Sequence, residues 1–387
     1  MTNHSLGERA GSESYLETVS FELRRLGHEV AFFSPRCGFM ADRLRQDGFP
    51  VVDEVDQLPS DFDVVHGQHA DVVALVRTRL GDTPMVFACH SWVIPVEDPM
   101  SELGAAAYVC FNELTHRRLA AHTATVGSQI VRMTQPVTVS FADAERAHVR
   151  AVPRAAVAVS RRMMLRPERL AALCAAAGIG FEWVGAPDAP SVDPRDRMRS
   201  ADIVFAEGRT ALEAMATGRA VYVVGEAYVG GWVTEASYQR LEADGFTGVE
   251  SDAGPVDLDD LAAGYHPHLG AQARQLAVQH HSAQHHAARL VELYTAVADL
   301  PPGQPCPPSV AMLAAERFAL EGRAVAAEWL AAERARELDG VRRELDEARA
   351  QRDKFLRQRN RARRGRDAQA PPPRLLDRLR DRRSAPG

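Results

Sequence analysis

ADIVFAEGRTALEAMATGRAVYVVG, residues 201–225, is the stretch of sequence that decides the fold. It holds two apolar runs, DIVFA and AVYVVG, with a short helical pattern between them. Gly218 follows the last residue of that pattern, where a glycine in the left-handed backbone region commonly ends a helix. The stretch therefore predicts a strand, a helix and a second strand, which is the repeating unit of a parallel α/β sheet.

Two interpretations are open for Glu213, which lies three residues after Thr210 in the predicted helix. The spacing Thr-x-x-Glu is that of a capping box, in which each side chain accepts a hydrogen bond from a free amide at the helix start. Alternatively, a carboxylate on the first turn of a helix that follows a strand faces the crevice in which α/β proteins bind ligands.

The same alternation recurs along the chain and predicts two domains. Before residue 140 the apolar runs EVAFFS, DVVHG, PMVFACH and AAYVCF alternate with helical patterns, and after residue 153 the runs AAVAVS, GFEWVG, DIVFA and AVYVVG do so. Strands that alternate with helices form parallel sheets with helices on both faces. We therefore expect one α/β domain at 1–142, a second at 143–300 and a cleft between them.

The C-terminal part of the chain has a different pattern. The proline-rich run PPGQPCPP cannot continue a helix, so we expect a linker at 301–310. Over 311–366 apolar and small residues recur at alternating spacings of three and four, which is typical of a coiled coil. A single helix that packs back on the protein is the alternative. Residues 367–387 predict a basic, disordered tail.

Composition limits the class of protein. The 387 residues carry a formal charge of −6, and the five cysteines are scattered, so neither a disulfide framework nor a zinc site is indicated. No apolar run approaches the roughly 18 residues of a membrane span, and residues 1–30 lack the apolar core of a signal peptide. We expect a cytoplasmic protein, a homo-oligomer through the predicted coiled coil, and peripheral contact of the basic tail with anionic surfaces, either lipid or nucleic acid.

At this point the motifs resemble a known family. The loop GERAGSE at residues 7–13, the helix that it opens and the EAMATG helix of the second domain resemble the GT-B glycosyltransferases, and most closely their retaining branch with nucleotide-sugar donors. DVVHGQHA, MVFACH and GGWVTEASYQRLEADGF resemble further segments of the family, and the resemblance covers about residues 1–298. It implies two Rossmann-like domains in GT-B architecture, to which this chain adds a C-terminal α-helical coiled-coil extension.

The resemblance also implies how the donor diphosphate is bound. In the family the diphosphate lies in the interdomain cleft, where cations and helix amides hold its charge. Arg161 and Arg166 match the family's basic pair, which would stabilise the departing nucleoside diphosphate. A solvated helix start is the alternative for these arginines. Gly208, Arg209 and Thr210 would place backbone amides near the phosphates.

Further contacts with the donor and the acceptor follow from the same resemblance. Glu213 matches the family carboxylate that accepts hydrogen bonds from ribose hydroxyls, and Gly11 and Ser12 of the glycine loop would contact substrate. The family often has an earlier glutamate that faces the donor sugar. This chain has Phe205 at that position, with Glu207 nearby but off register.

Histidines follow several predicted elements. His90 follows MVFAC, and the resemblance places it beside the donor sugar; a strand-end histidine satisfied by its neighbours is the alternative. His66 and His69 follow DVV in the same layer and are candidates on the acceptor side. His281 and His285 have the spacing of metal ligands, but no carboxylate motif accompanies them, so we expect a helix surface and no metal.

The resemblance implies a glycosyltransferase of hexosyltransferase type that moves a sugar with retention from a nucleotide sugar to an acceptor of unknown identity, without a cofactor. Such an enzyme orients both substrates and neutralises the leaving diphosphate. A sugar-nucleotide epimerase on the same fold is one alternative. A second alternative is a non-catalytic GT-B scaffold protein whose function is carried by the coiled coil.

The start of the chain departs from the family. Only MTNHS precedes LGERAG, whereas in the family an apolar central strand precedes the glycine loop, and Thr2, Asn3 and His4 resemble the end of that strand. A central parallel strand is normally buried on both faces and runs about five or six residues. We therefore expect a native start several apolar residues earlier, or else a shortened first sheet.

Overall fold

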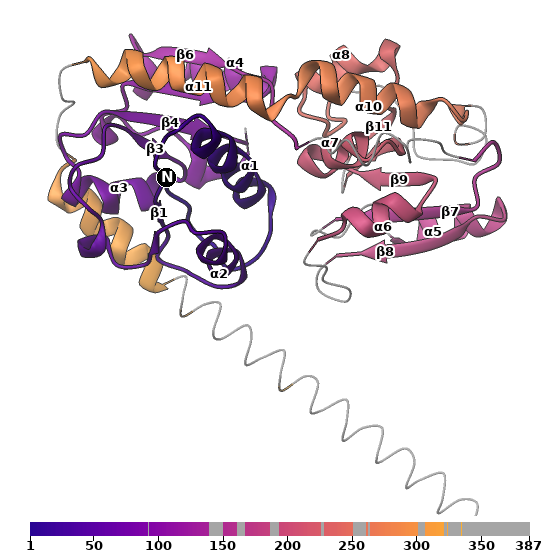
Figure 1. The fold of residues 1–387 in the computed structure, drawn as a ribbon, viewed down its shortest axis with the longest axis horizontal. Helices are drawn as coiled ribbons and strands as arrows, with labels where there is room; N and C mark the ends of the chain where they lie inside the picture. Colours follow the sequence, from indigo (N-terminus) through magenta and orange to yellow (C-terminus); the bar gives the residue numbers. More distant parts are fainter. Residues whose placement is uncertain are drawn as a thin grey trace, which may run out of the picture. The chain divides into compact units, whose positions relative to one another are not determined.

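The computed structural model describes residues 1–91, 93–138, 150–160, 167–185, 193–225, 228–250, 261, 264–300, 306–320, 323 and 334. The chain divides into two compact units, Met1–Glu316 and Arg317–Gly387, and the fold below is that of the first unit. It confirms the mixed α/β class, because mainly parallel strands alternate with helices along the described part of the chain (Figure 1). These strands form a two-stranded, a four-stranded and a five-stranded sheet; residues 1–3 join the first two, which together are called the first sheet.

The first sheet follows the first set of predicted strands. Four of its strands pair in parallel in the order β3-β4-β5-β6, and β1 pairs in parallel with β2. The side chains of β4 and β5 are buried throughout, as expected for parallel strands covered on both faces. The strands are β1 Phe32–Phe33, β2 Val51–Val52, β3 Val65–Gly67, β4 Met85–Cys89, β5 Ala107–Cys110 and β6 Gln129–Arg132.

Residues 1–3 lie between β1 and β3. On one side Asn3 N donates to Phe33 O (3.1 Å) and Phe33 N donates to Met1 O (2.9 Å); on the other side Thr2 N donates to His66 O (3.1 Å). The short segment therefore joins the β1–β2 pair to the four-stranded part of the sheet through hydrogen bonds on both of its edges.

The helices α2, α3 and α4 each follow a strand, and α1 follows the short extended segment 1–3, so their N-termini lie near the carboxyl edge of the sheet. Tyr15, Leu16, Val19 and Leu23 of α1 pack into the apolar core of this domain. The helices are α1 Gly11–Arg25, α2 Phe39–Gln46, α3 Ala70–Arg79 and α4 Glu113–Ala121, with short 3-10 turns η1 Val55–Gln57, η2 Pro95–Glu97, η3 Ser101–Leu103 and η4 Thr123–Thr125.

The opening stretch forms the predicted strand–helix–strand unit in the second sheet. Its strands pair in the order β11-β10-β9-β7-β8, all parallel except β11, which is antiparallel to β10. The strands are β7 Ala155–Val159, β8 Gly180–Val184, β9 Ile203–Ala206, β10 Ala220–Val224 and β11 Val229–Trp232. The helices are α5 Pro167–Ala176, α6 Arg195–Ser200, α7 Gly208–Ala216, α8 Glu235–Ala243 and α10 Leu269–His280.

The predicted stop of α7 and the departure at Phe205 both have a structural explanation. Gly218 has φ +73°, the left-handed conformation that ends the helix. Phe205 is fully buried in β9, with its ring centroid 5.9 Å from that of Tyr222. A side chain at this position is therefore part of the core of the second domain.

The last helix of the unit, α11 Ala283–Ala298, packs with the first sheet although the sequence pattern placed it in the 143–300 domain. Its apolar side chains Ala287, Leu290, Leu293 and Val297 belong to the core that contains α1, whereas α10 packs on the second sheet (Figure 1). An amphipathic pattern shows that a helix has a buried face but not which sheet that face covers.

The two chain segments that connect the domains run beside each other. Val137 N donates to His281 O (2.9 Å), and Thr134 Oγ1 donates to His280 O (2.7 Å). His281 is buried and bonds to the hydroxyl of Tyr238 (2.8 Å), which corrects the expectation of a helix surface at this residue. His285, one turn along, is exposed.

Little of the predicted coiled coil falls within the described residues. Residues 308–320 are helical, with Ala311 and Ala314 buried and Leu313 and Leu320 exposed. The rest of 311–366, except positions 323 and 334, and the basic tail at 367–387 lie outside the described residues. Across the part of the chain that the structure describes, no helix combines the length and apolar character needed to span a membrane.

Candidate functional site

A cavity of about 180 Å³ lies between the loop that precedes α1, the helices α1 and α2 of the first domain, and the helices α6 and α7 of the second. Cationic side chains dominate its charged lining. Five arginines face two glutamates there: Arg9, Arg43, Arg195, Arg199 and Arg209, with Glu17 and Glu213. Two of the arginines also contact carboxylates outside the lining, Arg195 with Asp193 and Arg199 with Asp196. The cavity is thus suited to an anionic ligand.

Glu213 does not cap its helix. The N-cap of α7 is Glu207, without a side-chain cap hydrogen bond, so Glu213 lies in the second turn, and of the two interpretations the capping box with Thr210 does not hold. Its carboxylate lines the cavity and forms a bidentate contact with Arg9, whose Nη2 and Nη1 donate to Oε1 (3.0 Å) and Oε2 (3.2 Å). The carboxylate faces the crevice, as the second interpretation required.

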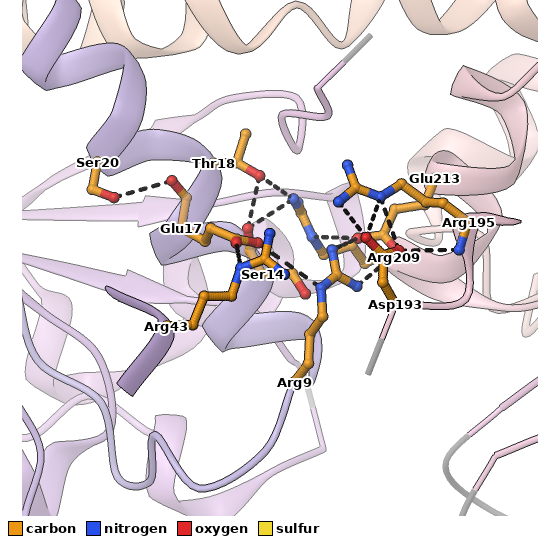
Figure 2. A network of polar contacts seen from close by, with 10 residues as sticks. All are labelled: Arg9, Ser14, Glu17, Thr18, Ser20, Arg43, Asp193, Arg195, Arg209 and Glu213. Atoms are coloured by element: carbon orange, nitrogen blue, oxygen red, sulfur yellow. Dashed lines mark hydrogen bonds and ion pairs between the residues drawn. The ribbon is translucent and has the colours of Figure 1, made fainter. Parts of the chain in front are cut away.

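Arg9 begins a row of charges of alternating sign (Figure 2). Its Nε lies 3.9 Å from Glu17 Oε2, and the other oxygen of Glu17 lies 2.6 Å from Nε of Arg43. Burial lowers the pKa of the Arg9 guanidinium, but the attraction and hydrogen bond to Glu213, together with attraction to Glu17 and Asp193, outweigh this effect and the net pKa is raised. Arg9 therefore stays charged and at the wall of the cavity.

Arg209 connects the two domains. Its guanidinium is buried and donates to Pro136 O (2.6 Å), Ser14 O (3.0 Å) and Thr18 Oγ1 (2.7 Å), which ties α7 to α1 (Figure 2). Burial lowers its pKa to about 10, opposed by attraction to Glu213, whose Oε1 lies 3.6 Å from Arg209 Nε. The side chain thus serves the interdomain contact as well as the cavity wall.

The structure also shows where the other residues predicted to contact the phosphates or the substrate lie. Gly208 has φ +57° and its amide donates to Phe246 O (2.8 Å), so this amide is already used within the protein. Thr210 is half-buried in the first turn of α7. Gly11 is exposed at the start of α1, and Ser12 Oγ donates to Glu13 Oε2 (3.1 Å). Arg161 and Arg166 lie outside the described residues.

The predicted histidines gather around Tyr15 of α1 at the carboxyl edge of the first sheet. The Tyr15 ring stacks on His66 (centroids 5.8 Å apart) and meets His90 edge-on (4.7 Å). Burial lowers the pKa of His66 to about 3 and that of His90 well below its usual value, so both rings are neutral near pH 7. His66 Nδ1 bonds to the hydroxyl of Tyr294 (2.7 Å). The structure therefore brings His66 and His90 together.

His69 lies beside this cluster in a strained position. It has φ +63°, unusual for a residue with a side chain, at the N-cap of α3. Its Nδ1 accepts from the amide of His4 (3.1 Å), and His4 in turn contacts Asp71 (3.0 Å). Among the described residues, no group of three or more ligating side chains is placed to hold a metal ion.

The sequence missed several of these residues. Arg9 lies in the glycine loop that the motif singled out, and its positive charge was a signal that could have been used. Glu17 and Arg43 line the same cavity but belong to helical patterns without a motif. A second cavity, of about 230 Å³, lies at the amino ends of β7 and β8, away from the carboxyl ends at which α/β sheets bind ligands.

The sequence matches no family model and no curated protein. Solved glycosyltransferase structures resemble the fold at low identity. Anabaena HepE in complex with UDP is 14% identical with a TM-score of 0.49, over 76% of this chain and 98% of that one. AviGT4, a glycosyltransferase of avilamycin A biosynthesis, is 16% identical (TM-score 0.48; 78% and 94%), and WaaG, a glycosyltransferase of lipopolysaccharide biosynthesis, is 12% identical (TM-score 0.39; 75% and 98%). Because the identities are low and the TM-scores lie below 0.5, the function proposed next rests on this chain's own residues.

Proposed function

We propose that this protein is a glycosyltransferase of GT-B architecture that transfers a sugar from a nucleotide-sugar donor to an acceptor, with retention of anomeric configuration. The observation that carries the proposal is the arginine-lined cavity between the glycine loop and α7. It lies where the sequence resemblance expects the donor diphosphate, and it has the charge that a diphosphate requires.

The chemistry follows from the residues at the cavity. Transfer breaks the bond between the anomeric carbon of the sugar and the diphosphate oxygen, forms a bond from that carbon to an acceptor hydroxyl oxygen, and passes the hydroxyl proton to the departing nucleoside diphosphate. Arg9, Arg43 and Arg195 would neutralise the departing diphosphate in a shielded site, where fixed cations contribute most to transition-state stabilisation. The proposed ribose contact is Glu213. The neutral rings of His66 and His90 suit uncharged sugar hydroxyls, because each neutral imidazole offers one donor and one acceptor.

The proposal also includes residues and regions that were predicted from the sequence. Arg161 and Arg166 are the proposed basic pair of the family, and His90 the proposed donor-sugar contact. The proposed domains are 1–142 and 143–300, with the α11 segment assigned by packing to the first. A homo-oligomer through 311–366 and a cytoplasmic location with peripheral contact at anionic surfaces are further proposals.

A thermal-shift screen tests the proposal. The full chain is heated with UDP, GDP, dTDP and their sugars, with the corresponding nucleosides as controls that lack phosphate. We expect one nucleoside diphosphate to raise the melting temperature and its nucleoside to do so far less. Arg24→Gln, which changes an exposed arginine on α1, should keep the shift, and Arg9→Gln should reduce it. No shift with any nucleotide at millimolar concentration would favour the scaffold over the enzyme.

A further inference from the structure

A buried carboxylate that no motif marks lies beside His90. Glu97 ends the turn η2 and is 4% exposed. Its Oε2 accepts hydrogen bonds from the amides of both His90 and Ser91, each at 2.5 Å. Cys89 Sγ donates to Glu97 O (3.3 Å). Through Glu97, the chain that follows β4 is therefore hydrogen-bonded to the carboxyl end of that strand.

Glu97 also lies near ionisable groups of α3, of α4 and of the residue that follows it. Its Oε1 lies 4.0 Å from Nε2 of His69 at the start of α3. Because Nδ1 of His69 accepts from the amide of His4, the ring proton of a neutral His69 lies on the nitrogen that faces Glu97. Arg118 of α4, paired with Asp98, is the nearby cation. Burial raises the pKa of Glu97 to about 7, against the opposing effect of the two amides and Arg118.

The His90 ring is held by packing and has free polar atoms. It contacts Tyr15 (4.7 Å) and Phe111 (4.6 Å between centroids). Both ring nitrogens are buried and have no hydrogen-bond partner in the described part of the chain, and the same holds for Nε2 of His66 and the side-chain amide of Gln68. These neutral donors and acceptors match an uncharged ligand with several hydroxyl groups.

We propose that Glu97 is a positioning residue that fixes the turn after β4, so that the imidazole of His90 is presented to a hydroxyl group of the substrate. The part that concerns substrate rests on the proposed function. The part that concerns the turn rests only on the two amide contacts and the packing of the ring.

The protonation state of the Glu97 carboxyl group should control how firmly the turn after β4 is held. An ionised Glu97 accepts both amide hydrogen bonds as charge-assisted bonds, which are about twice as strong as neutral ones. In a protonated Glu97 one oxygen carries the proton and acts as a donor. The hydrogen bonds from the two amides then lose their charge assistance, and the turn is held less firmly. The environment of His90 should then change with pH around neutrality, although its own ring remains uncharged there.

Glu97→Gln tests this, because glutamine keeps the shape and one acceptor oxygen but cannot ionise. Glu242→Gln is the matched control: Glu242 is another largely buried carboxyl with a raised pKa, on α8 and paired with Arg132. Melting curves first establish that both variants fold. NMR of the imidazole nitrogens, with His90→Asn to assign the signals, then follows His90 between about pH 6 and pH 8.

In the wild type and in Glu242→Gln we expect the His90 signals to shift with a midpoint near neutrality, and in Glu97→Gln we expect that transition to be absent. A transition that persists in Glu97→Gln, or none in the wild type, would overturn the proposal.

A kinetic comparison addresses the substrate. With the nucleotide sugar that gives the largest melting shift, release of nucleoside diphosphate should show kcat about tenfold lower in Glu97→Gln above neutral pH, with donor KM little changed. The wild-type kcat should rise through neutrality, and that of Glu97→Gln should not. Equal pH profiles would remove the link to substrate. If no nucleotide sugar is turned over, the proposed function fails, while the NMR comparison still decides the role of Glu97.

Discussion

Replacement of Glu213 by glutamine removes one negative charge from between two buried guanidiniums. Arg9 loses a bidentate partner at 3.0 and 3.2 Å, and Arg209 loses a carboxylate at 3.6 Å from its Nε. The side chains of all three residues are no more than 10% exposed, so only the small cavity that they line can supply water to the lost contact. The volume of residue 213 is unchanged.

The magnitude follows from these distances. At an effective dielectric constant of about 20, unit charges 3.0 Å apart attract by about 5 kcal/mol, and those 3.6 Å apart by slightly less. Much of this attraction offsets the desolvation of the three charges, and removal of one partner from a buried pair typically costs about 3–5 kcal/mol. We therefore expect Glu213→Gln to lose about 3–5 kcal/mol of unfolding free energy. A residue that only capped the helix would lose a few tenths, because glutamine also serves in a capping box.

Urea unfolding of Glu213→Gln, Arg9→Gln and the double variant gives the test. Arg9→Gln should cost less than Glu213→Gln, because Glu213 keeps Arg209 while Glu213→Gln leaves two cations without their shared anion. The double variant should cost clearly less than the sum of the single variants, as expected for residues in contact. A Glu213→Gln protein that unfolds within about 0.5 kcal/mol of the wild type would refute the buried charge contact. Calorimetry on the folded variant should also show about tenfold weaker donor binding, which is about 1.4 kcal/mol.

Four further predictions follow from separate features. Arg9→Gln should weaken pyrophosphate binding about tenfold in calorimetry; unchanged or tighter binding would mean that Arg9 only pairs with Glu213 and does not contact the phosphates. Gly248→Ala should cost more than about 2 kcal/mol in urea unfolding, because φ is +79° and a Cβ would lie 2.6 Å from a backbone nitrogen; a cost near zero would contradict this. Light scattering should give more protomers for the full chain than for residues 1–300, and equal numbers would exclude an oligomer through 311–366. If the full chain binds anionic liposomes, a higher salt concentration should weaken that binding. Since the pKa of Glu97 is about 7 when folded and near 4.5 when unfolded, the folded state binds more protons between these values, and stability should fall as pH rises through that window. The same decline in Glu97→Gln would assign it to other groups.

Local pattern was sufficient for the elements of the second sheet. The runs DIVFA and AVYVVG are continuous apolar segments, and Gly218 has the left-handed conformation that a helix end favours, so β9, α7 and β10 could be derived from residues 201–225 alone. The same reasoning located β3, β4 and β5 in the first sheet. The parallel class follows because strands that alternate with helices must cross over in the same direction.

The role of Glu213 could not be derived in this way. The spacing of Thr210 and Glu213 is compatible with a capping box, but the position of the helix start decides whether that box exists. In the structure the helix begins at Gly208, after Glu207 at the N-cap. The partner of Glu213 is Arg9, 204 residues earlier in the chain, and no local spacing encodes a contact of that range.

The sequence by itself determined the class of the fold, most of its strands, and the two motifs that border the candidate site, because these depend on periodicity and on single residues with special backbone freedom. Tertiary structure decided which sheet α11 covers, that His66 and His90 both contact the ring of Tyr15, and that Glu97 accepts a hydrogen bond from the amide of His90. These outcomes depend on the register of neighbouring strands and on the packing of helices across them. Such contacts join residues that are distant along the chain, and only the folded arrangement specifies their distances and charges.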